Sequence, residues 1–163
     1  MRRMVCCFFL LSTVETSAEG LEKLPAPISV NGRTEIAHVE GVGAQIYACS
    51  KNAKGSLEWT FREPIATLVD KGTTIGRHFA GPTWEFADGS YVSGKLAAKF
   101  PGQSTRDIPW LKLSVVKQAT TGPAAGATWI LRLDTKGGTF EGACLLEGGL
   151  HAEPYAATYI FGR

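Results

Sequence analysis

Residues 83–93 read TWEFADGSYVS, and this stretch places an Asp-Gly pair between two runs in which apolar and polar residues alternate. An Asp-Gly pair in such a setting favours a two-residue turn that joins two antiparallel strands. In that register Phe86 faces Tyr91 and Trp84 faces Ser93, so one side of the hairpin is aromatic. The stretch therefore predicts a β-hairpin whose aromatic side lies in a core or lines a groove.

The same pattern of short β-branched and aromatic runs, separated by Gly, Pro, Asn and Asp, continues along the chain in both directions. No window keeps a helical spacing over three turns, and only Glu63 to Asp70, where Pro64 can open a helix, is a candidate for a short helix or turn. The predicted strands are Ala44 to Ser50, Leu57 to Arg62, Thr74 to Phe79, Thr83 to Ala87, Ser90 to Lys99, Trp110 to Lys117, Ala127 to Thr135 and Tyr155 to Phe161. This pattern predicts an all-β domain, a single antiparallel β-sandwich or barrel with at most one short helix, and the sequence does not separate these two architectures.

The strand predicted between Ala127 and Thr135 alternates with unusual regularity. One face carries Trp129, Leu131 and Leu133, and the other carries Ile130, Arg132 and Asp134. Successive side chains of a strand point to opposite sides, so one face is apolar and the other is partly charged. Such a strand suits the wall of a sandwich or barrel.

Length and composition indicate one globular domain. The chain has 163 residues, of which 44% are hydrophobic and 20% are charged, and its formal net charge is +2. The charges of both signs are interleaved, so there is no basic stripe of the kind that binds phosphates, and nucleic acid is not expected as a partner. The β domain is predicted to span residues 35–163, after an irregular lead-in over residues 19–34 that holds two prolines.

The first eighteen residues have the pattern of a signal peptide. Arg2 and Arg3 precede an uncharged apolar run from Met4 to Leu11, and small residues follow, with Ala18 suited to cleavage. The alternatives are a buried N-terminal strand or a membrane anchor, but the run is much shorter than the roughly 20 residues of a spanning helix, so no transmembrane span is expected. The sequence thus predicts export to a periplasmic or extracellular location.

Cleavage at that position would leave two of the four cysteines, Cys49 and Cys144. In an oxidising compartment these two have one possible intramolecular pairing, so we expect a disulfide, the alternative being two buried free thiols. The bridge would close a long loop and tie distant β segments together.

Several compact catalytic motifs are absent from the mature sequence, namely CxxC, HExxH, GxSxG and the P-loop. Gly41-Val42-Gly43 lacks the third glycine of a dinucleotide site and is interpreted as a turn or bulge. The three histidines, at 38, 78 and 151, have no short ligand spacing between them. We therefore predict neither a metal site nor a cofactor.

The strongest candidate for a site surrounds the Gly81-Pro82 turn. His78, Trp84 and Asp88 lie close together in sequence there, and together with Trp110 they are predicted to line a groove for a small molecule or a cell-envelope component. Arg132 is the further candidate that we expect to converge on this groove.

Two other functions compete with this binding site. The first is a hydrolase in which His78 is the general base and Asp88 or Glu85 orients it. The second is a structural or interaction module, which an exposed apolar patch would favour. The sequence does not identify a ligand or an oligomeric state.

A set of short motifs, in a fixed order, resembles one family. They are Gln45-Ile46-Tyr47-Ala48-Cys49, Trp59, His78-Phe79-Ala80-Gly81-Pro82-Thr83-Trp84, Asp88-Gly89-Ser90, Ile108-Pro109-Trp110-Leu111, Arg132, Thr135-Lys136-Gly137-Gly138, Cys144 and Pro154-Tyr155-Ala156-Ala157. The chain from Val39 to Phe161 resembles domain of unknown function 3455. The resemblance implies an exported bacterial protein, with fungal relatives and without an established activity. Lys112 stands where the family is usually apolar, so we do not expect this position in the deep core.

Overall fold

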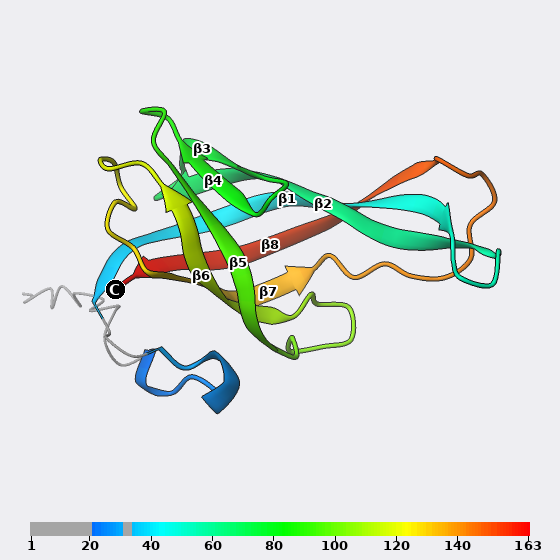
Figure 1. Cartoon of the computed structure of the whole chain (residues 1–163), viewed down its shortest axis with the longest axis horizontal. Helices are drawn as coiled ribbons and strands as arrows, with labels where there is room; N and C mark the ends of the chain where they lie inside the picture. The colour runs from blue at the N-terminus through cyan, green and yellow to red at the C-terminus, as the bar shows by residue number, and fades with distance from the viewer. Residues whose placement is uncertain (1–20, 31–33) are drawn as a thin grey trace, which may run out of the picture.

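The computed structural model describes residues 21–30 and 34–163, and eight antiparallel strands close into one barrel. Each strand pairs with the next along the chain, and β1 pairs with β8 to close the ring (Figure 1). The elements are η1 (Ala26–Ile28), β1 (Glu35–Lys51), β2 (Leu57–Asp70), β3 (Thr73–Phe79), β4 (Thr83–Phe86), β5 (Tyr91–Phe100), β6 (Trp110–Gln118), β7 (Trp129–Gly137) and β8 (Leu150–Gly162). The all-β prediction is confirmed, and of the two architectures left open the chain adopts the barrel.

All eight predicted strands are present, but the prediction of a short helix or turn is wrong. The residues from Glu63 to Asp70 form the second half of β2. Pro64 is tolerated because it follows a β-bulge at Arg62 and precedes Ala66, where the ladder to β3 begins. A proline is accepted in a strand where its missing N–H would face no partner, and Pro64 occupies such a position.

The predicted hairpin forms, but its register differs by one residue. The Phe86 amide donates to the Ser90 carbonyl at 2.8 Å, so the loop has three residues, and Trp84 pairs with Val92. Gly89, with φ 80°, occupies the left-handed position that such loops require. The Asp88 carboxylate holds the turn by accepting from the Ser90 amide at 2.9 Å and from its hydroxyl at 2.6 Å. Trp84 is buried as predicted, with Val92 opposite it in the core.

The segment Gly41-Val42-Gly43 is not a turn, because it runs through the middle of β1. A Cβ atom at Gly41 would lie 2.5 Å from the ring of Tyr159, and one at Gly43 would lie 2.1 Å from the Ile65 carbonyl oxygen. Glycine inside a strand often marks such a close approach. These two positions therefore let β2 and the Tyr159 ring pack directly against the backbone of β1.

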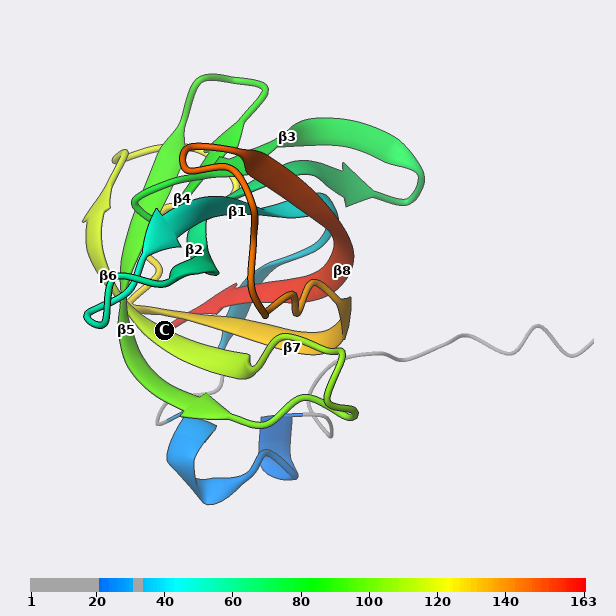
Figure 2. The same cartoon turned by 90° about the vertical axis from the view of Figure 1, so that its right-hand side faces the viewer.

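The barrel has one core inside its wall and a second core outside it. The inner core contains Leu68, Trp84 and Phe161. The outer core lies where the N-terminal segment, residues 21–30, covers β7, and in Figure 1 and Figure 2 this segment runs beneath the barrel. It joins Leu21, Ile28 and Val30 to Trp129, Leu131 and Leu133.

The outer core decides which face of β7 points inward. The alternation predicted for this strand is confirmed, but its apolar face packs outward against the N-terminal segment. Ile130 belongs to the inner core instead, and Arg132 shares its side of the strand. On the neighbouring β6, Lys112 donates to the Ser29 carbonyl of the covering segment, in agreement with its expected absence from the deep core.

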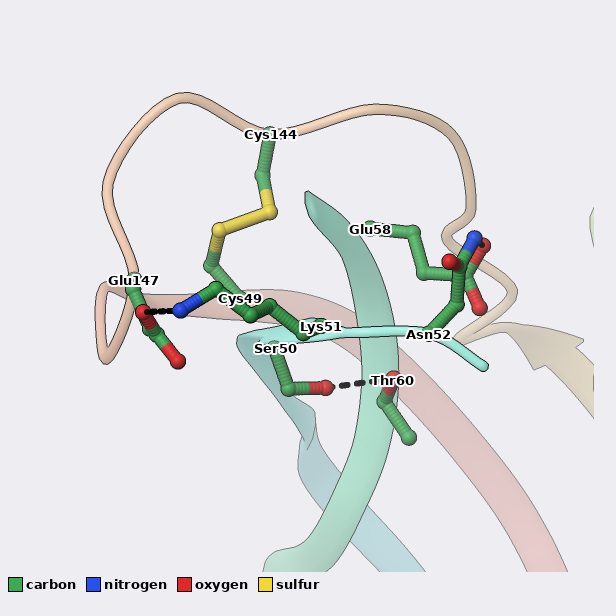
Figure 3. Close-up of a disulfide and its surroundings, with 8 residues drawn as sticks. All are labelled: Cys49, Ser50, Lys51, Asn52, Glu58, Thr60, Cys144 and Glu147. Carbon is green, nitrogen blue, oxygen red and sulfur yellow. Dashed lines mark hydrogen bonds and ion pairs between the residues drawn. A yellow bond between two sulfur atoms is a disulfide. The ribbon is translucent and has the colours of Figure 1, made fainter. Parts of the chain in front are cut away.

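The predicted disulfide joins Cys49 to Cys144 across 95 residues. Cys49 lies near the end of β1, and Cys144 lies in the long loop between β7 and β8 (Figure 3). The same loop is held by backbone hydrogen bonds, including Cys49 N–H to the Gly149 carbonyl at 2.8 Å, and by an ion pair between Lys51 and Glu147 at 2.8 Å. The bridge thus ties this loop to the far end of the β1–β2 hairpin.

Among the described residues, no helical segment combines the length and the apolarity that a membrane crossing requires. The predicted signal peptide, residues 1–18, lies outside the described part of the chain.

Candidate ligand-binding cavity

One end of the barrel interior is not filled by side chains. A cavity of about 290 Å³ opens there, beside the turn from Ala80 to Pro82. Its wall is mainly apolar and includes Pro64, Leu96, Leu111, Leu113 and Trp84. Polar groups in the wall come from His78, Arg132 and Tyr159, together with the exposed Arg62. An apolar cavity with a few convergent polar groups is the usual form of a small-molecule site.

His78 comes from β3 and is held in one orientation. Its ring stacks on Trp84 with centroids 4.3 Å apart, and its Nδ1 lies 2.9 Å from the Thr83 carbonyl oxygen. A carbonyl only accepts hydrogen bonds, so in the neutral ring the proton is on Nδ1 and Nε2 carries the lone pair. The prediction that Asp88 or Glu85 orients the His78 ring is wrong, because Glu85 pairs with Arg77 and Asp88 pairs with Ser90.

Burial keeps the His78 imidazole neutral. The side chain is 3% exposed, and desolvation lowers its pKa from 6.5 to about 4, with a smaller contribution from the positive charge of Arg132. The hydrogen bond to Thr83 acts in the opposite direction but is weaker. At neutral pH, Nε2 is thus available as a hydrogen-bond acceptor.

Arg132 is the only charged group on the β7 side of the cavity among the described residues. Its Nε and Nη2 atoms donate to the Pro109 carbonyl at 3.1 and 2.8 Å, and the guanidinium also hydrogen-bonds the Tyr159 hydroxyl. In the described part of the chain no carboxylate lies within ion-pair distance of it. Burial lowers the pKa of Arg132, but an arginine keeps its charge at any physiological pH.

Two tyrosines of β8 complete the polar part of the interior. Their hydroxyls, on Tyr155 and Tyr159, lie 3.2 Å apart. Burial raises the pKa of Tyr155 and raises that of Tyr159 well above its ordinary value, so both remain neutral donors and acceptors. The sequence analysis did not propose either tyrosine as a site residue. The signal was the period of two in β8, which places residues 155, 157, 159 and 161 on one face.

Three buried donors have no hydrogen-bond partner among the described residues. They are Nε1 of Trp84, in the cavity wall, Nε2 of Gln45, a side chain that is 2% exposed, and Nε1 of Trp110, at the edge of the outer core. Buried donors are paired in most native structures, and leaving one unpaired costs about 1–3 kcal/mol. A hydrogen-bond acceptor on a bound ligand could therefore pair with the Trp84 indole N–H.

The predicted site residues divide into two sets. The structure brings His78, Trp84 and Arg132 together in one cavity. Asp88 lies at the opposite end of β4, in the turn to β5, and borders a different hollow beside His38. Trp110 packs at the edge of the outer core, with its ring 6.4 Å from that of Phe100.

The cavity wall offers little that a hydrolase would use. No serine, threonine, cysteine, aspartate or glutamate is among the described residues that line it. His78 makes its Nδ1 hydrogen bond to a backbone carbonyl, where a catalytic triad would place a carboxylate. The described wall thus provides binding groups but no serine, threonine or cysteine that His78 could activate.

A different surface bears on the interaction-module alternative. Leu145, Leu146 and Leu150, in and after the disulfide-bonded loop, are 98%, 73% and 58% exposed. Exposed apolar groups of this kind can contact a partner, but nothing in the structure indicates the chemistry of that partner.

Comparison with known proteins gives one match. The family model described as Protein of unknown function (DUF3455) matches residues 30–162, which include the whole barrel. No curated protein and no solved structure shows significant similarity to the chain.

Proposed function

The chain belongs to the DUF3455 family, and we propose that it binds a small, largely apolar molecule in the cavity at the His78 end of the barrel. The observation that carries the proposal is the combination of an unfilled interior volume of about 290 Å³ with a guanidinium and an indole N–H that lack full partners. Both features are expected where a protein interior is completed by a ligand.

The barrel architecture supports this proposal. The interior of an eight-stranded barrel is just wide enough either to be filled by side chains or to hold one small ligand. Here Phe86, Val92 and Phe161 fill the inner core, whereas the side chains around Pro64 and the Ala80–Pro82 turn leave a cavity between them. A cavity of this size lies at the lower limit of small-molecule sites, about 300 Å³.

Enzymatic hydrolysis with His78 as the general base is the weaker candidate. A general base needs a nucleophile within hydrogen-bond reach, and the described wall has none. A substrate could bring a water molecule with it, but no residue favours this over simple binding.

The proposal is tested with a panel of small aromatic and aliphatic compounds, each used as a carboxylic acid and as its primary amide. We expect at least one member to raise the melting temperature of the wild-type protein. Leu111→Trp, which places a larger side chain in the cavity wall, is expected to abolish that shift, because the cavity volume is lost. Val116→Trp, on the same strand but exposed, is the matched control and should retain it.

Two results would contradict binding in the cavity. One is a panel in which no compound stabilises the wild type. The other is an equal shift of the melting temperature in the wild type and in Leu111→Trp, which would show that the compound binds outside the cavity.

We also propose that the protein acts after export, in a periplasmic or extracellular compartment. The Cys49–Cys144 disulfide supports this, because disulfides persist mainly in oxidising compartments. The expected result is that the protein isolated from its native compartment begins at residue 19 and carries no thiol that reacts with iodoacetamide. Intact-mass spectrometry measures both properties, and a full-length chain with two or more alkylated cysteines would exclude export.

A further inference from the structure

We propose that the ligand is a monoanion, a carboxylate on a compact apolar body, and that its carboxylate binds to Arg132 in the wall of the cavity. The inference rests on the proposed function and adds the chemical class of the molecule.

The first argument is the unbalanced charge of Arg132. Transferring a guanidinium from water into a protein interior is costly unless an opposite charge compensates it. Arg132 lines the cavity from β7, and its described partners are the Pro109 carbonyl and the Tyr159 hydroxyl, both uncharged. An anionic ligand would supply the missing charge.

The second argument is the number of free donors. An arginine has five N–H groups, of which two point to the Pro109 carbonyl and one to Tyr159. Two remain without a partner among the described residues. The planar guanidinium matches a carboxylate by parallel hydrogen bonds, and the Trp84 indole N–H in the same wall is a further unpaired donor.

The third argument is the absence of competing negative charge. Within the described wall the other titratable groups are His78 and Tyr159, both neutral at pH 7, and Arg62 at the rim. Arg62 is exposed and lies 3.1 Å from the carboxylate of Glu63, so this ion pair contributes little to the electrostatic field inside the cavity. One half-buried cation in a wall whose described residues include no carboxylate favours a monoanion over a dianion such as a phosphate monoester.

The apolar wall determines the chemistry of the rest of the ligand. Leu111, Leu113 and Trp84 surround the volume next to Arg132, and they offer contact area but no hydrogen-bond acceptor. Among the side chains of the wall, His78 offers Nε2 as an acceptor, because its Nδ1 is used by the Thr83 carbonyl. A single ring or a short chain therefore fits, with at most one hydroxyl or amide donor directed at His78.

Isothermal titration of matched acid and amide pairs tests the inference, with benzoate and benzamide, cinnamate and cinnamamide, and octanoate and octanamide as probes. Each amide keeps the shape of its acid and removes the charge. For the wild type we expect the best acid to bind at least about tenfold more tightly than its amide, since hydrogen bonds to charged groups are the strong ones. In Arg132→Gln the ratio is expected to fall to near one.

Matched variants separate this effect from general damage. Arg106→Gln removes the same charge from an exposed loop and should keep the wild-type ratio. Arg132→Lys retains a charge but loses the planar donor pair, and we expect it to retain part of the acid preference. If Arg132→Gln does not fold, Arg132→Lys and the wild-type ratio decide the question.

The outcomes distinguish the two proposals. If acid and amide bind the wild type equally, or if Arg132→Gln keeps the preference for the acid, the anionic ligand is excluded while binding in the cavity stands. If no member of any pair binds, the proposed function fails together with the inference. An acid preference that Arg106→Gln also abolishes would indicate attraction by overall charge and would exclude the role of Arg132.

Discussion

Replacing both Cys49 and Cys144 by serine is expected to lower the free energy of unfolding by about 4 kcal/mol. The disulfide closes a loop of 95 residues, and the entropy that a cross-link removes from the unfolded chain grows with loop length, reaching about 4.7 kcal/mol for 100 residues. The loop between β7 and β8 keeps its backbone hydrogen bonds to β1 and β2, such as Trp59 N–H to the Gly142 carbonyl, so the expected loss comes from the unfolded chain and the fold is expected to persist. Urea unfolding of the oxidised wild type and of the double variant measures the difference.

Lys51→Ala is the matched control. It removes the Lys51–Glu147 ion pair, which joins the same two segments but is exposed on both sides, so a change of less than about 1 kcal/mol is expected. If the double serine variant unfolded at the same urea concentration as the wild type, the cross-link would not be what stabilises this end of the barrel.

The strands could be predicted from the sequence because their signals are local. Alternation and turn residues locate all eight strands, as in the hairpin around Asp88, but β1 begins at Glu35 and not at Ala44, and β2 continues to Asp70 and not only to Arg62. Closure into a barrel could not be predicted, because it depends on β1 pairing with β8, where Ala48 meets Leu150. No local pattern reports a contact over such a distance, and two sheets packed face to face would have produced the same alternation.

Two local errors have a common physical cause. Pro64 can open a helix, but it can also occupy a strand position at which a neighbouring strand is absent on one side. Only the β-bulge at Arg62 and the start of pairing with β3 at Ala66 show that the second case applies. Gly41 resembles a turn residue, whereas the deciding contact is the Tyr159 ring, which lies 118 residues away in the chain. In both cases the tertiary neighbour overrides the local preference.

The composition of the site was partly predictable. The stretch around the Gly81-Pro82 turn identified His78 and Trp84, because polar and aromatic residues near a tight turn suit a cavity mouth. Asp88 was grouped with them by its closeness in sequence, but one short strand separates the two ends of the barrel, so residues a few positions apart face different hollows. The place of Arg132 depends on which face of β7 the N-terminal segment covers, and no pattern within β7 reveals that.

The cavity combines rigidity with an unmatched charge. His78 is fixed by Trp84 and the Thr83 carbonyl, and Arg132 is fixed by the Pro109 carbonyl, so neither group must be ordered when a ligand arrives. Pre-ordered groups lower the entropic cost of binding. The arrangement also makes the empty site sensitive to further positive charge, because a proton on His78 would lie beside Arg132 in a poorly solvated space.

That sensitivity leads to a strong expected loss of stability in acid. The pKa of His78 is about 4 in the folded protein and 6.5 in its unfolded reference state. Between these values the unfolded chain binds a proton that the folded chain does not, so the free energy of unfolding falls as the pH decreases from about 6.5 to about 4. The loss is about 3 kcal/mol at pH 4 relative to pH 7, since each unit of difference corresponds to 1.36 kcal/mol.

Urea unfolding at pH 7 and pH 4 measures this loss in the wild type, in His78→Gln and in His38→Gln. His78→Gln is expected to lose about 3 kcal/mol less than the wild type between the two pH values, whatever its stability at pH 7, because it has no imidazole to protonate. His38 is half-exposed on the outside of β1, so its replacement should leave the wild-type difference in place. If His78→Gln were as sensitive to acid as the wild type, His78 would not be the buried neutral group on which the charge balance of the cavity depends.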